Sequence, residues 1–592
     1  MMLPGIVLGV VVLLAFAYVA YGRVIARQYR LDDARVTPAV AKADGVDFVP
    51  ARPFYLLGQH FSAIAAAGPI VGPIAACLLF GWGPCLLWIA IGVVFIGAVH
   101  DFSALVASVR HGAHSIADIA RQHLGRRAWL ALVAFIWLAL IYIIVAFTDV
   151  TAQTFRGLSD ELLAVPGAFS KGGAVAAAST MYLGLALLMG VAHRFLRAPT
   201  WLLTLIFVPA TLGVVLLGTK VDHVLNFDAG TWHVVILLYC VVASVLPMWL
   251  LQQPRGYLGG FVLYIAIGVG LIGAVAGGFE VRQPAFRPMP DYVAFFTGGP
   301  DAPGMGTLIF PFLFVTIACG ACSGFHGLIC GGTTSRQVAL ESHCRPVAFG
   351  GMLLEGLVAV IALATVMIVA DSERAGRTPG VLYGDGLAMF VTRLLDPGAL
   401  SGGSPLSSPV FVMAATFGAM AFSTFVFDTL DVSTRLGRYL LCELFGATSR
   451  WAGLLAAAVT AGVPLAVLLA PSSAPGTGTP TYMLFWTLFG TANQLLAALT
   501  LLGICVWLRT QGRRVWFVFF PMVFVMTITI SALGVQIFTG VRSVVVSGLG
   551  ARPEVLNALV GCALLALAIT FIVEGTRAAR RARPAPEGAA SA

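Results

Sequence analysis

Residues 52–73 read RPFYLLGQHFSAIAAAGPIVGP, and this stretch decides the fold because polar residues and two Gly-Pro pairs interrupt an otherwise apolar, membrane-length segment. A helix in the hydrocarbon core must satisfy its own backbone hydrogen bonds, since no water is available there. Breaks are tolerated only where the freed groups are buried in protein or line a cavity. The stretch therefore predicts an interrupted helix that lines a binding site, not a plain membrane anchor.

The composition of the whole chain predicts an all-α polytopic membrane protein. Of its 592 residues, 59% are hydrophobic and 10% are charged, whereas a soluble domain has about 25% charged residues. A helical span takes about 20 apolar residues. Fifteen segments meet this requirement, near residues 3–22, 57–80, 85–109, 128–150, 172–192, 199–218, 231–252, 258–278, 308–330, 347–370, 408–430, 452–470, 481–507, 515–539 and 557–574.

The basic residues indicate how the chain is oriented in the membrane. With the loops assigned alternately to the two sides, one set holds 25 of the 35 Lys and Arg residues. This excess predicts that the set is cytoplasmic, with the N-terminus outside and the C-terminus inside. The net charge of +9 is thereby explained by membrane orientation and contact with the lipid bilayer, so we expect no nucleic-acid partner.

The N-terminus and the cysteines carry no sign of processing or of a metal centre. The first apolar segment begins at Leu3 without a charged region before it, so we expect a retained helix and not a signal peptide. Most of the ten cysteines lie inside predicted spans, which argues against a disulfide framework. Cys319 and Cys322 have CxxC spacing, but no second pair lies at zinc spacing. We therefore expect no metal and no cofactor.

A second interruption is predicted at Pro247, inside the segment 231–252. This segment is the sixth when counting starts from 57–80, and transporters built from two inverted five-helix repeats have broken first helices in both halves. The alternative is that proline is common in membrane helices in any case. The predicted organisation is an extra N-terminal helix (1–30), a first repeat (51–218), a second repeat (231–430), accessory helices (431–575) and a disordered cytoplasmic tail (576–592).

Several motifs together resemble the carbon starvation protein A (CstA) family. They extend over about residues 5–540, and the first and last of them are long and specific. They are RPFYLLGQHFSAIAAAGPIVGP at 52–73, His100-Asp101-Phe102, LPMWLL at 246–251 followed by Pro254-Arg255, Cys322-Ser323-Gly324-Phe325-His326, Gly332-Thr333-Thr334 and LFGTANQLL at 488–496.

The resemblance implies a secondary transporter of the bacterial inner membrane with a LeuT-like fold, one helix before its ten-helix core and four after it. Described members take up pyruvate or peptides, and proton coupling is the favoured mode. This chain is about a hundred residues shorter than the long enterobacterial-type members. It also has Gly256-Tyr257 where Asp-Tyr is expected, so the substrate is not inherited from the resemblance.

The predicted substrate site centres on the break at Gly68-Pro69. The free N–H groups that begin the second half-helix favour an anion, and the unpaired carbonyls that end the first half-helix favour a cation or an ammonium group. A small carboxylate such as pyruvate, an amino acid or a short peptide fits this polarity, and Arg52 or Arg255 can assist at the cytoplasmic mouth. The predicted substrate-binding residues are Gln59, Ser62, Ala67, Gly68, Pro69, Gly72, Leu246, Pro247 and Trp249.

The predicted ion-coupling residues are ionisable or hydroxyl side chains inside spans, where such groups are usually functional. For each histidine, packing is the competing interpretation. Asp428 and Asp431 are expected to form a structural ion pair with Arg435. Ser323, on a helical face shared with Cys319 and His326, is the candidate for sodium coupling instead of proton coupling. The full set is His60, His100, Asp101, Ser323, His326 and Glu355.

The sequence predicts a symporter that works by alternating access. A membrane-embedded enzyme is the main rival, but no nucleophile–base pair has an orienting third group. A sensor that binds substrate without moving it is a third possibility, and a homo-oligomer stays possible. Asn493 and Gln494 are assigned to helix–helix hydrogen bonding outside the ten-helix core.

Overall fold

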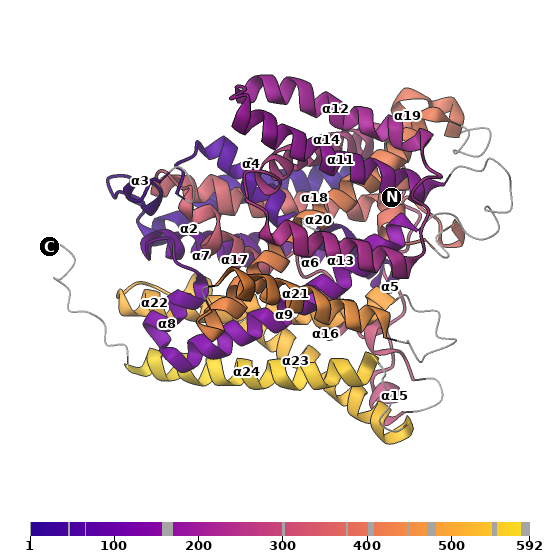
Figure 1. Ribbon diagram of the computed structural model, residues 1–592. Helices are drawn as coiled ribbons and strands as arrows, with labels where there is room; N and C mark the ends of the chain where they lie inside the picture. Colours follow the sequence, from indigo (N-terminus) through magenta and orange to yellow (C-terminus); the bar gives the residue numbers. More distant parts are fainter. Residues whose placement is uncertain are drawn as a thin grey trace.

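The computed structural model describes residues 2–44, 48–65, 67–156, 170–298, 302–373, 377–400, 408–447, 449–470, 481–547 and 553–581, and among these residues it contains no β-strand (Figure 1). The all-α prediction is confirmed. The α-helices are α1 (Leu3–Phe16), α2 (Gly22–Tyr29), α3 (Pro38–Ala41), α4 (Pro53–Ile64), α5 (Gly68–Phe80), α6 (Trp82–Gly92), α7 (Ala98–Arg110), α8 (Ile116–Leu124), α9 (Arg126–Phe155), α11 (Lys171–Phe195), α12 (Thr200–Lys220), α13 (Ala229–Val245), α14 (Gln252–Ala276), α15 (Tyr292–Thr297), α16 (Ile309–Thr316), α17 (Gly324–Gly332), α18 (Gly350–Met367), α19 (Pro379–Leu395), α20 (Pro409–Phe445), α21 (Arg450–Leu469), α22 (Thr481–Thr510), α23 (Trp516–Ser547) and α24 (Pro553–Arg581).

Twelve of the described helical stretches are long and apolar enough to cross a membrane, or thirteen if the bent pair α4–α5 is one span. The predicted count of fifteen is not confirmed. The three segments that fall short are α4–α5, the 17-residue α13 and the two short helices α16 and α17. Hydropathy detects apolar stretches but not where a helix stops within one, which explains the difference.

Capping side chains define where several helices begin. Ser115, Ser170 and Ser449 each accept a hydrogen bond from a backbone N–H in the first turn of the helix that follows. Asp228 does the same at the start of α13. Such residues satisfy donors that have no partner inside the helix. These caps fix the ends of the spans and therefore the depth of the side chains they carry.

The predicted interruption at Gly68-Pro69 is confirmed. The first half-helix, α4, ends at Ile64, and α5 begins at Gly68 with Pro69 in its first turn. The two halves are bent by 46°. Proline suits the first turn because it has no N–H group to leave without a partner. Ala66, in the middle of the break, lies outside the described residues.

The second interruption is not where the sequence predicted it. Helix α13 ends at Val245, so Pro247 lies in a turn before α14 and does not break a span. The second interrupted segment is α16–α17, in which residues 317–323 are not helical. Glycine and other small residues occupy this break, and it contains no proline. The sequence marked it only by the CxxC pair, so a search for prolines inside spans did not detect it. The predicted helical face through Cys319, Ser323 and His326 is also wrong, because those positions do not share one helix.

The two interrupted segments have matching neighbours. The long helices α9 and α20 pack against each other, and both contact α13 and α21. Helix α14 packs against α4 and α20, while α22 packs against α17 and α9 in the corresponding way. Helix α18 covers α5, and α7 covers α17. The five helices α4–α5, α6–α7, α9, α13 and α14 thus correspond in packing to α16–α17, α18, α20, α21 and α22.

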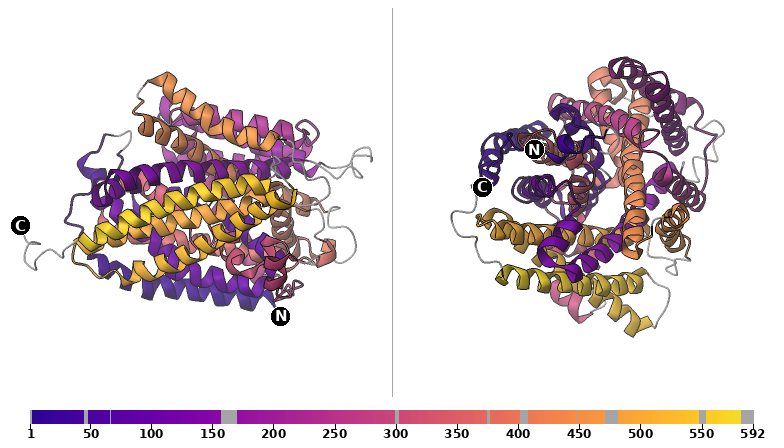
Figure 2. Two further views of the ribbon diagram at one scale, coloured as in Figure 1. Left: turned by 90° about the horizontal axis from the view of Figure 1, so that it is seen from below. Right: turned by 60° about the vertical axis from the view of Figure 1, so that its left-hand side comes forward.

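The long helices run side by side between two ends of the molecule (Figure 2). The start of α1 lies at one end, and the end of α24 lies at the other, together with α3 and α8. We call this second end the basic end, because Arg110 at the end of α7 donates there to the Tyr29 and Arg30 carbonyls, and Arg513 after α22 donates to the Gln28 carbonyl. The prediction of a disordered tail from residue 576 is wrong for residues 576–581, because α24 continues to Arg581; residues 582–592 lie outside the described residues.

Candidate functional site

The two breaks touch each other at the centre of the molecule. Gly68 lies against Cys319, where an added Cβ would overlap the cysteine side chain, and Pro69 lies beside Gly320. A Cβ on Gly72 would fall 2.6 Å from the Thr316 carbonyl oxygen. These contacts need small residues because two backbones meet there without side chains between them. The inner ends of the four half-helices α4, α5, α16 and α17 therefore converge on one point.

A chain of four buried ionisable side chains lies beside this point. His100 and Asp101 are on α7, His326 is on α17 and Glu355 is on α18, and all four are 0% exposed. The Nδ1 atoms of His100 and His326 lie 2.7 and 2.8 Å from the two carboxylate oxygens of Asp101. The Nε2 atom of His326 lies 3.1 Å from Oε2 of Glu355. We call these four residues the relay.

The geometry of the relay limits where its protons can lie. With Asp101 ionised, the carboxylate accepts from both histidines and each Nδ1 carries a hydrogen. A proton on the remaining pair, His326 Nε2 and Glu355, makes it either imidazolium with carboxylate or neutral imidazole with carboxylic acid. Neither Glu355 oxygen nor His326 Nε2 has a hydrogen-bond partner among the described residues. The 3.1 Å approach of these two groups is therefore an ion-pair contact between two titratable side chains.

His60 connects the relay to the first half-helix. It is 1% exposed on α4, and its Nδ1 lies 2.9 Å from the Thr334 hydroxyl. Its ring packs against Gly351 at the start of α18, and it interacts electrostatically with Asp101 and His326. The structure thus brings together five of the six predicted ion-coupling residues, and only Ser323 lies apart from them.

A second buried charge cluster lies on the other side of α4. The Arg255 guanidinium, at the start of α14, donates to both Asp428 and Asp431 on α20. The Tyr239 hydroxyl donates to Asp431 at 2.8 Å. The predicted partner Arg435 is wrong: it donates instead to main-chain carbonyls of residues 243 and 246. Sequence spacing favoured the neighbour on the same helix, whereas α14 brings an arginine from far away in the chain.

Ser62 ties the first half-helix to this cluster. Its hydroxyl donates to Asp428 Oδ2 at 3.3 Å, while Arg255 Nε donates to the other oxygen at 2.6 Å. Gly259 leaves room for this contact, because a Cβ on Gly259 would lie 3.2 Å from the Ser62 hydroxyl oxygen and 3.2 Å from Asp428 Oδ2. Tyr182 donates to the Arg255 carbonyl at 2.8 Å. Ser62 therefore faces a charge cluster, and Arg255 is 0% exposed and does not line an open mouth.

The second break is held by neutral groups of α22. The Asn493 amide donates to the Ser323 hydroxyl at 3.0 Å and accepts from the Phe325 N–H at 2.9 Å. Gln494 donates to the Phe314 carbonyl at 3.0 Å, and Trp486 donates to the Thr316 carbonyl at 3.1 Å. The predicted hydrogen bonding by Asn493 and Gln494 is present, but α22 packs on the break and is not an outer helix.

The structure separates three predicted substrate-binding residues from the breaks. Leu246, Pro247 and Trp249 lie in the turn between α13 and α14, where the Trp249 ring packs against Arg194 and Phe195 at the end of α11. Ala67 is the residue before α5, and Gln59 is half-buried on α4. Of the predicted substrate-binding residues, only those within residues 52–73 therefore lie on α4, on α5 or in the break between them.

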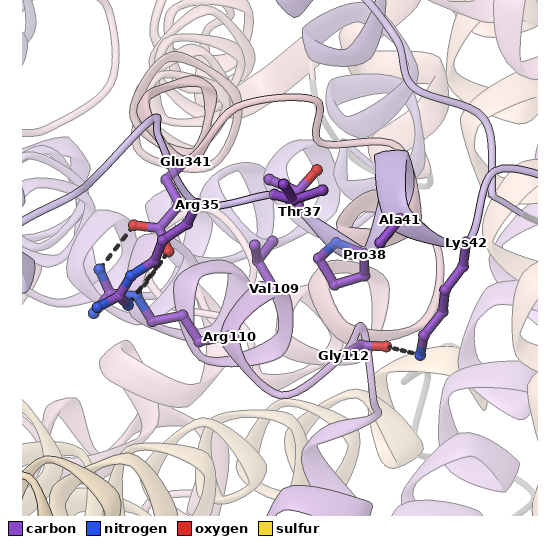
Figure 3. A pocket seen from close by; sticks show the side chains of 10 residues that line it. Arg35, Thr37, Pro38, Ala41, Lys42, Val109, Arg110, Gly112 and Glu341 are labelled. Carbon is purple, nitrogen blue, oxygen red and sulfur yellow. Dashed lines mark hydrogen bonds and ion pairs between the residues drawn. The ribbon is translucent and has the colours of Figure 1, made fainter. Parts of the chain in front are cut away.

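A cavity of 440 Å³ opens at the basic end, away from the crossing (Figure 3). Arg110 donates to both oxygens of Glu341 at 2.8 and 3.0 Å, and Arg35 lies 3.9 Å from the same carboxylate. On the opposite wall, Lys42 donates to the Gly112 carbonyl at 3.1 Å. The Arg110 and Glu341 side chains are 9% and 3% exposed. Their hydrogen bonds join α7 to the segment before α18, so we interpret this pair as structural.

Two histidines meet at the same end outside the spans. His111 follows α7 and His123 lies on α8, with their Nε2 atoms 2.9 Å apart. Burial, and to a smaller extent neighbouring His114, lowers the pKa of His111. Burial and His111 lower the pKa of His123. The pair is therefore held in a form in which both rings cannot be charged together.

These features define a class before any relative is considered: a polytopic membrane protein whose two interrupted helices cross beside buried ionisable groups, as in secondary transporters. The sequence matches the family described as "Carbon starvation protein CstA" over residues 4–386 and 403–532. The chain belongs to this family. The family and its named relatives are transporters and not enzymes.

Relatives cover most of this chain. The peptide transporter CstA of Bacillus subtilis is 31% identical over 97% of this chain and 96% of its own length. The pyruvate/proton symporter BtsT of Escherichia coli is 30% identical over 88% of this chain and 80% of its own. The peptide transporter CstA of the same species is 32% identical over 89% and 80%.

Solved structures of other transporters show a weaker likeness. A manganese transporter of Eremococcus coleocola aligns with a TM-score of 0.48 and 12% identity, over 90% of this chain and 99% of its own. MhsT in complex with L-phenylalanine aligns with a TM-score of 0.44 and 14% identity, over 89% and 98%.

Proposed function

We propose that the protein is a proton symporter that imports a small organic carboxylate, an amino acid or a short peptide by alternating access. The observation that carries the proposal is the relay, in which His326 Nε2 lies 3.1 Å from Glu355 Oε2 beside two crossed helix breaks. Relatives named as a pyruvate/proton symporter and as peptide transporters support the substrate classes.

The substrate is proposed to bind at the first break. The residues are Gln59, Ser62, Ala67, Gly68, Pro69 and Gly72. The start of α5 carries the positive end of a helix dipole, which suits a carboxylate. The end of α4 offers carbonyls to an ammonium group. Because Gly68 lies against Cys319, a bound substrate has to part the two breaks, and a small substrate requires the least movement.

Proton coupling is favoured over sodium coupling by the chemistry of the buried groups. Sodium prefers several oxygen ligands, whereas the relay contributes imidazole nitrogens and carboxylates that titrate. Ser323, the predicted sodium ligand, is hydrogen-bonded to the Asn493 amide. A histidine–carboxylate pair is a group that can load and release a proton near neutral pH.

The packing supports two inverted repeats with boundaries that differ from 51–218 and 231–430. We propose that the first repeat contains α4–α7, α9, α13 and α14, and that the second contains α16–α18 and α20–α22. The hairpin of α11 and α12 is then an insertion in the first repeat. Helix α1 precedes the core, and α23 and α24 follow it.

The chain is a multi-pass membrane protein, and we propose the bacterial inner membrane as its location. The distribution of Lys and Arg supports a cytoplasmic basic end, with the N-terminus outside and the C-terminus inside. The first half-helix then reaches the centre from the cytoplasm.

Uptake into proteoliposomes tests the proposal. Labelled pyruvate, alanine and dialanine are each offered with an inward proton gradient, an inward sodium gradient or neither. Accumulation driven only by the proton gradient supports the symporter. Accumulation driven only by sodium would assign the alternative coupling ion, and binding without accumulation would indicate a sensor.

A further inference from the structure

The two half-helices that reach the crossing from opposite ends of the molecule are held by different chemistry. The half-helix α16 is held through its own carbonyls by neutral donors, Gln494 and Trp486. The half-helix α4 is held through Ser62, whose hydroxyl donates to the Asp428 carboxylate. A hydrogen bond to a charged group is about twice as strong as a neutral one. The hydrogen bond that holds α4 against α20 is thus made to a charged group.

Asp428 is held in place by groups that do not belong to α4. Arg255 on α14 donates to it and to Asp431, and Tyr239 on α13 donates to Asp431. Tyr182 on α11 fixes the Arg255 main chain. Four helices therefore present one carboxylate oxygen to α4.

The same half-helix is attached on its other side through His60, which interacts electrostatically with the relay residues Asp101 and His326. His60 lies two residues before Ser62, so the two side chains point about 200° apart on the helix. His60 contacts Thr334 and α18, while Ser62 contacts Asp428. Helix α4 is therefore clamped between the relay and the Arg255–Asp428–Asp431 cluster.

We propose that Asp428 and Ser62 form the latch that holds α4 closed at the basic end, with Arg255 and Asp431 as positioning residues for the Asp428 carboxylate. Movement of α4 away from α20 and α14 breaks the Ser62 hydroxyl contact and the ring contacts of Tyr55 with Tyr257 and of Phe61 with Tyr264, but leaves the ion pairs intact. The cluster stays charge-compensated in both positions, which avoids exposing an unpaired buried charge to the membrane. This inference rests on the proposed function, because a latch matters only if α4 moves during transport.

A cysteine placed at Gln59 reports the position of α4. Gln59 is half-buried and precedes Ser62 by three residues, so both lie on one face. The native Cys442 and Cys562 are not buried, so both are changed to serine in the reporter protein. The purified full-length chain in nanodiscs is labelled with a membrane-impermeant maleimide, and the rate of labelling is measured.

We expect Ser62→Ala to increase the labelling rate by roughly tenfold, because it removes the charge-assisted hydrogen bond and leaves the ion pairs in place. Ser62→Thr keeps the hydroxyl and should label at nearly the parent rate. Arg255→Lys, which cannot reach both carboxylates in the same geometry, should label faster than the parent.

Asp149→Asn is the matched control. Asp149 is also a buried carboxylate, 2.9 Å from His233, but it lies on α9 and does not contact α4. An unchanged rate in Ser62→Ala, or an equal increase in Asp149→Asn, would overturn the latch. The labelling experiment needs no transported substrate, so its result is independent of the uptake experiment. The latch can be overturned while gradient-driven uptake is observed. If the labelling rates change as expected but no uptake is observed, the result counts against the proposed symporter alone.

Discussion

At the scale of single residues, the relay is the arrangement that gives this membrane protein a titratable centre. Asp101 uses both oxygens on histidines, and the second ring nitrogen of His326 lies 3.1 Å from Glu355. Buried polar groups inside a membrane are costly unless they are paired, and such groups are usually kept for function. The relay is fully buried; its Asp101 carboxylate is paired with two histidines, whereas the Glu355 oxygens have no hydrogen-bond partner among the described residues.

Glu355→Gln should separate coupling from binding. Glutamine can still donate a hydrogen bond to His326 but cannot take up or release a proton. We expect proton-driven accumulation of the transported substrate to fall at least tenfold, with exchange of labelled for unlabelled substrate retained. Both rates are measured in the same proteoliposomes. Equal accumulation in mutant and parent would remove Glu355 from the coupling mechanism.

The histidine pair at the basic end should make stability depend on pH. The pKa values of His111 and His123 are lowered in the folded protein, so the unfolded chain binds more protons once the pH falls below about 6.5. Stability from this pair is therefore complete above that pH and is lost as the pH falls toward the lowered values.

Thermal unfolding of the parent and of His123→Gln between pH 8 and pH 5 measures this effect. We expect the melting temperature of the parent to fall more steeply below pH 6.5 than that of the mutant. Parallel curves would show that the contact between the two rings has no energetic consequence.

Sequence reasoning found five members of the relay region, His60, His100, Asp101, His326 and Glu355, by their type and depth alone. It did not predict which of them touch, because adjacent residues on a helix diverge by about 100° and contacts between helices depend on packing. It missed the role of Arg255 for the same reason: spacing points to partners on one helix, and here the partners come from α14 and α20.

At the scale of helices, the fold depends on glycines that let two breaks meet. Gly68→Ala places a methyl group where Cys319 already lies, so we expect a loss of roughly 1–3 kcal/mol in stability or a displaced break. Transport should fall at least tenfold. Gly184→Ala on α11 is the control, since nothing lies within 4 Å of its added Cβ. Melting temperature and uptake are measured for both; equal behaviour would mean that the breaks are not in contact.

The first break was predictable and the second was not, for a physical reason. Proline removes a backbone donor and therefore marks the break at Gly68-Pro69 in the sequence itself. The break at 317–323 has no proline within it, and it is stabilised by α22 through Asn493, Gln494 and Trp486. When the contacts that stabilise a break come from neighbouring helices, the sequence of the interrupted helix itself gives little indication of the break.

At the scale of the whole molecule, the ends of the helices determine which direction the proposed cycle runs. The start of α1 and the end of α24 lie at opposite ends (Figure 2), as an odd number of membrane crossings requires. The basic end carries the arginines that the positive-inside rule assigns to the cytoplasm. If this orientation is right, α4 and its contact with Asp428 face the cytoplasm, and opening there releases substrate into the cell.

Reporter fusions test the orientation directly. A green fluorescent protein fused after Ala592 should fluoresce, because it folds in the cytoplasm, and alkaline phosphatase fused at the same point should be inactive. Fusions placed after Gly298, at the opposite end, should behave in the reverse way. The opposite result at both points would show that the protein is inserted in the membrane in the opposite orientation. The Ser62–Asp428 contact would then close the outer side, and the same relay geometry would have to load its proton from the cytoplasm.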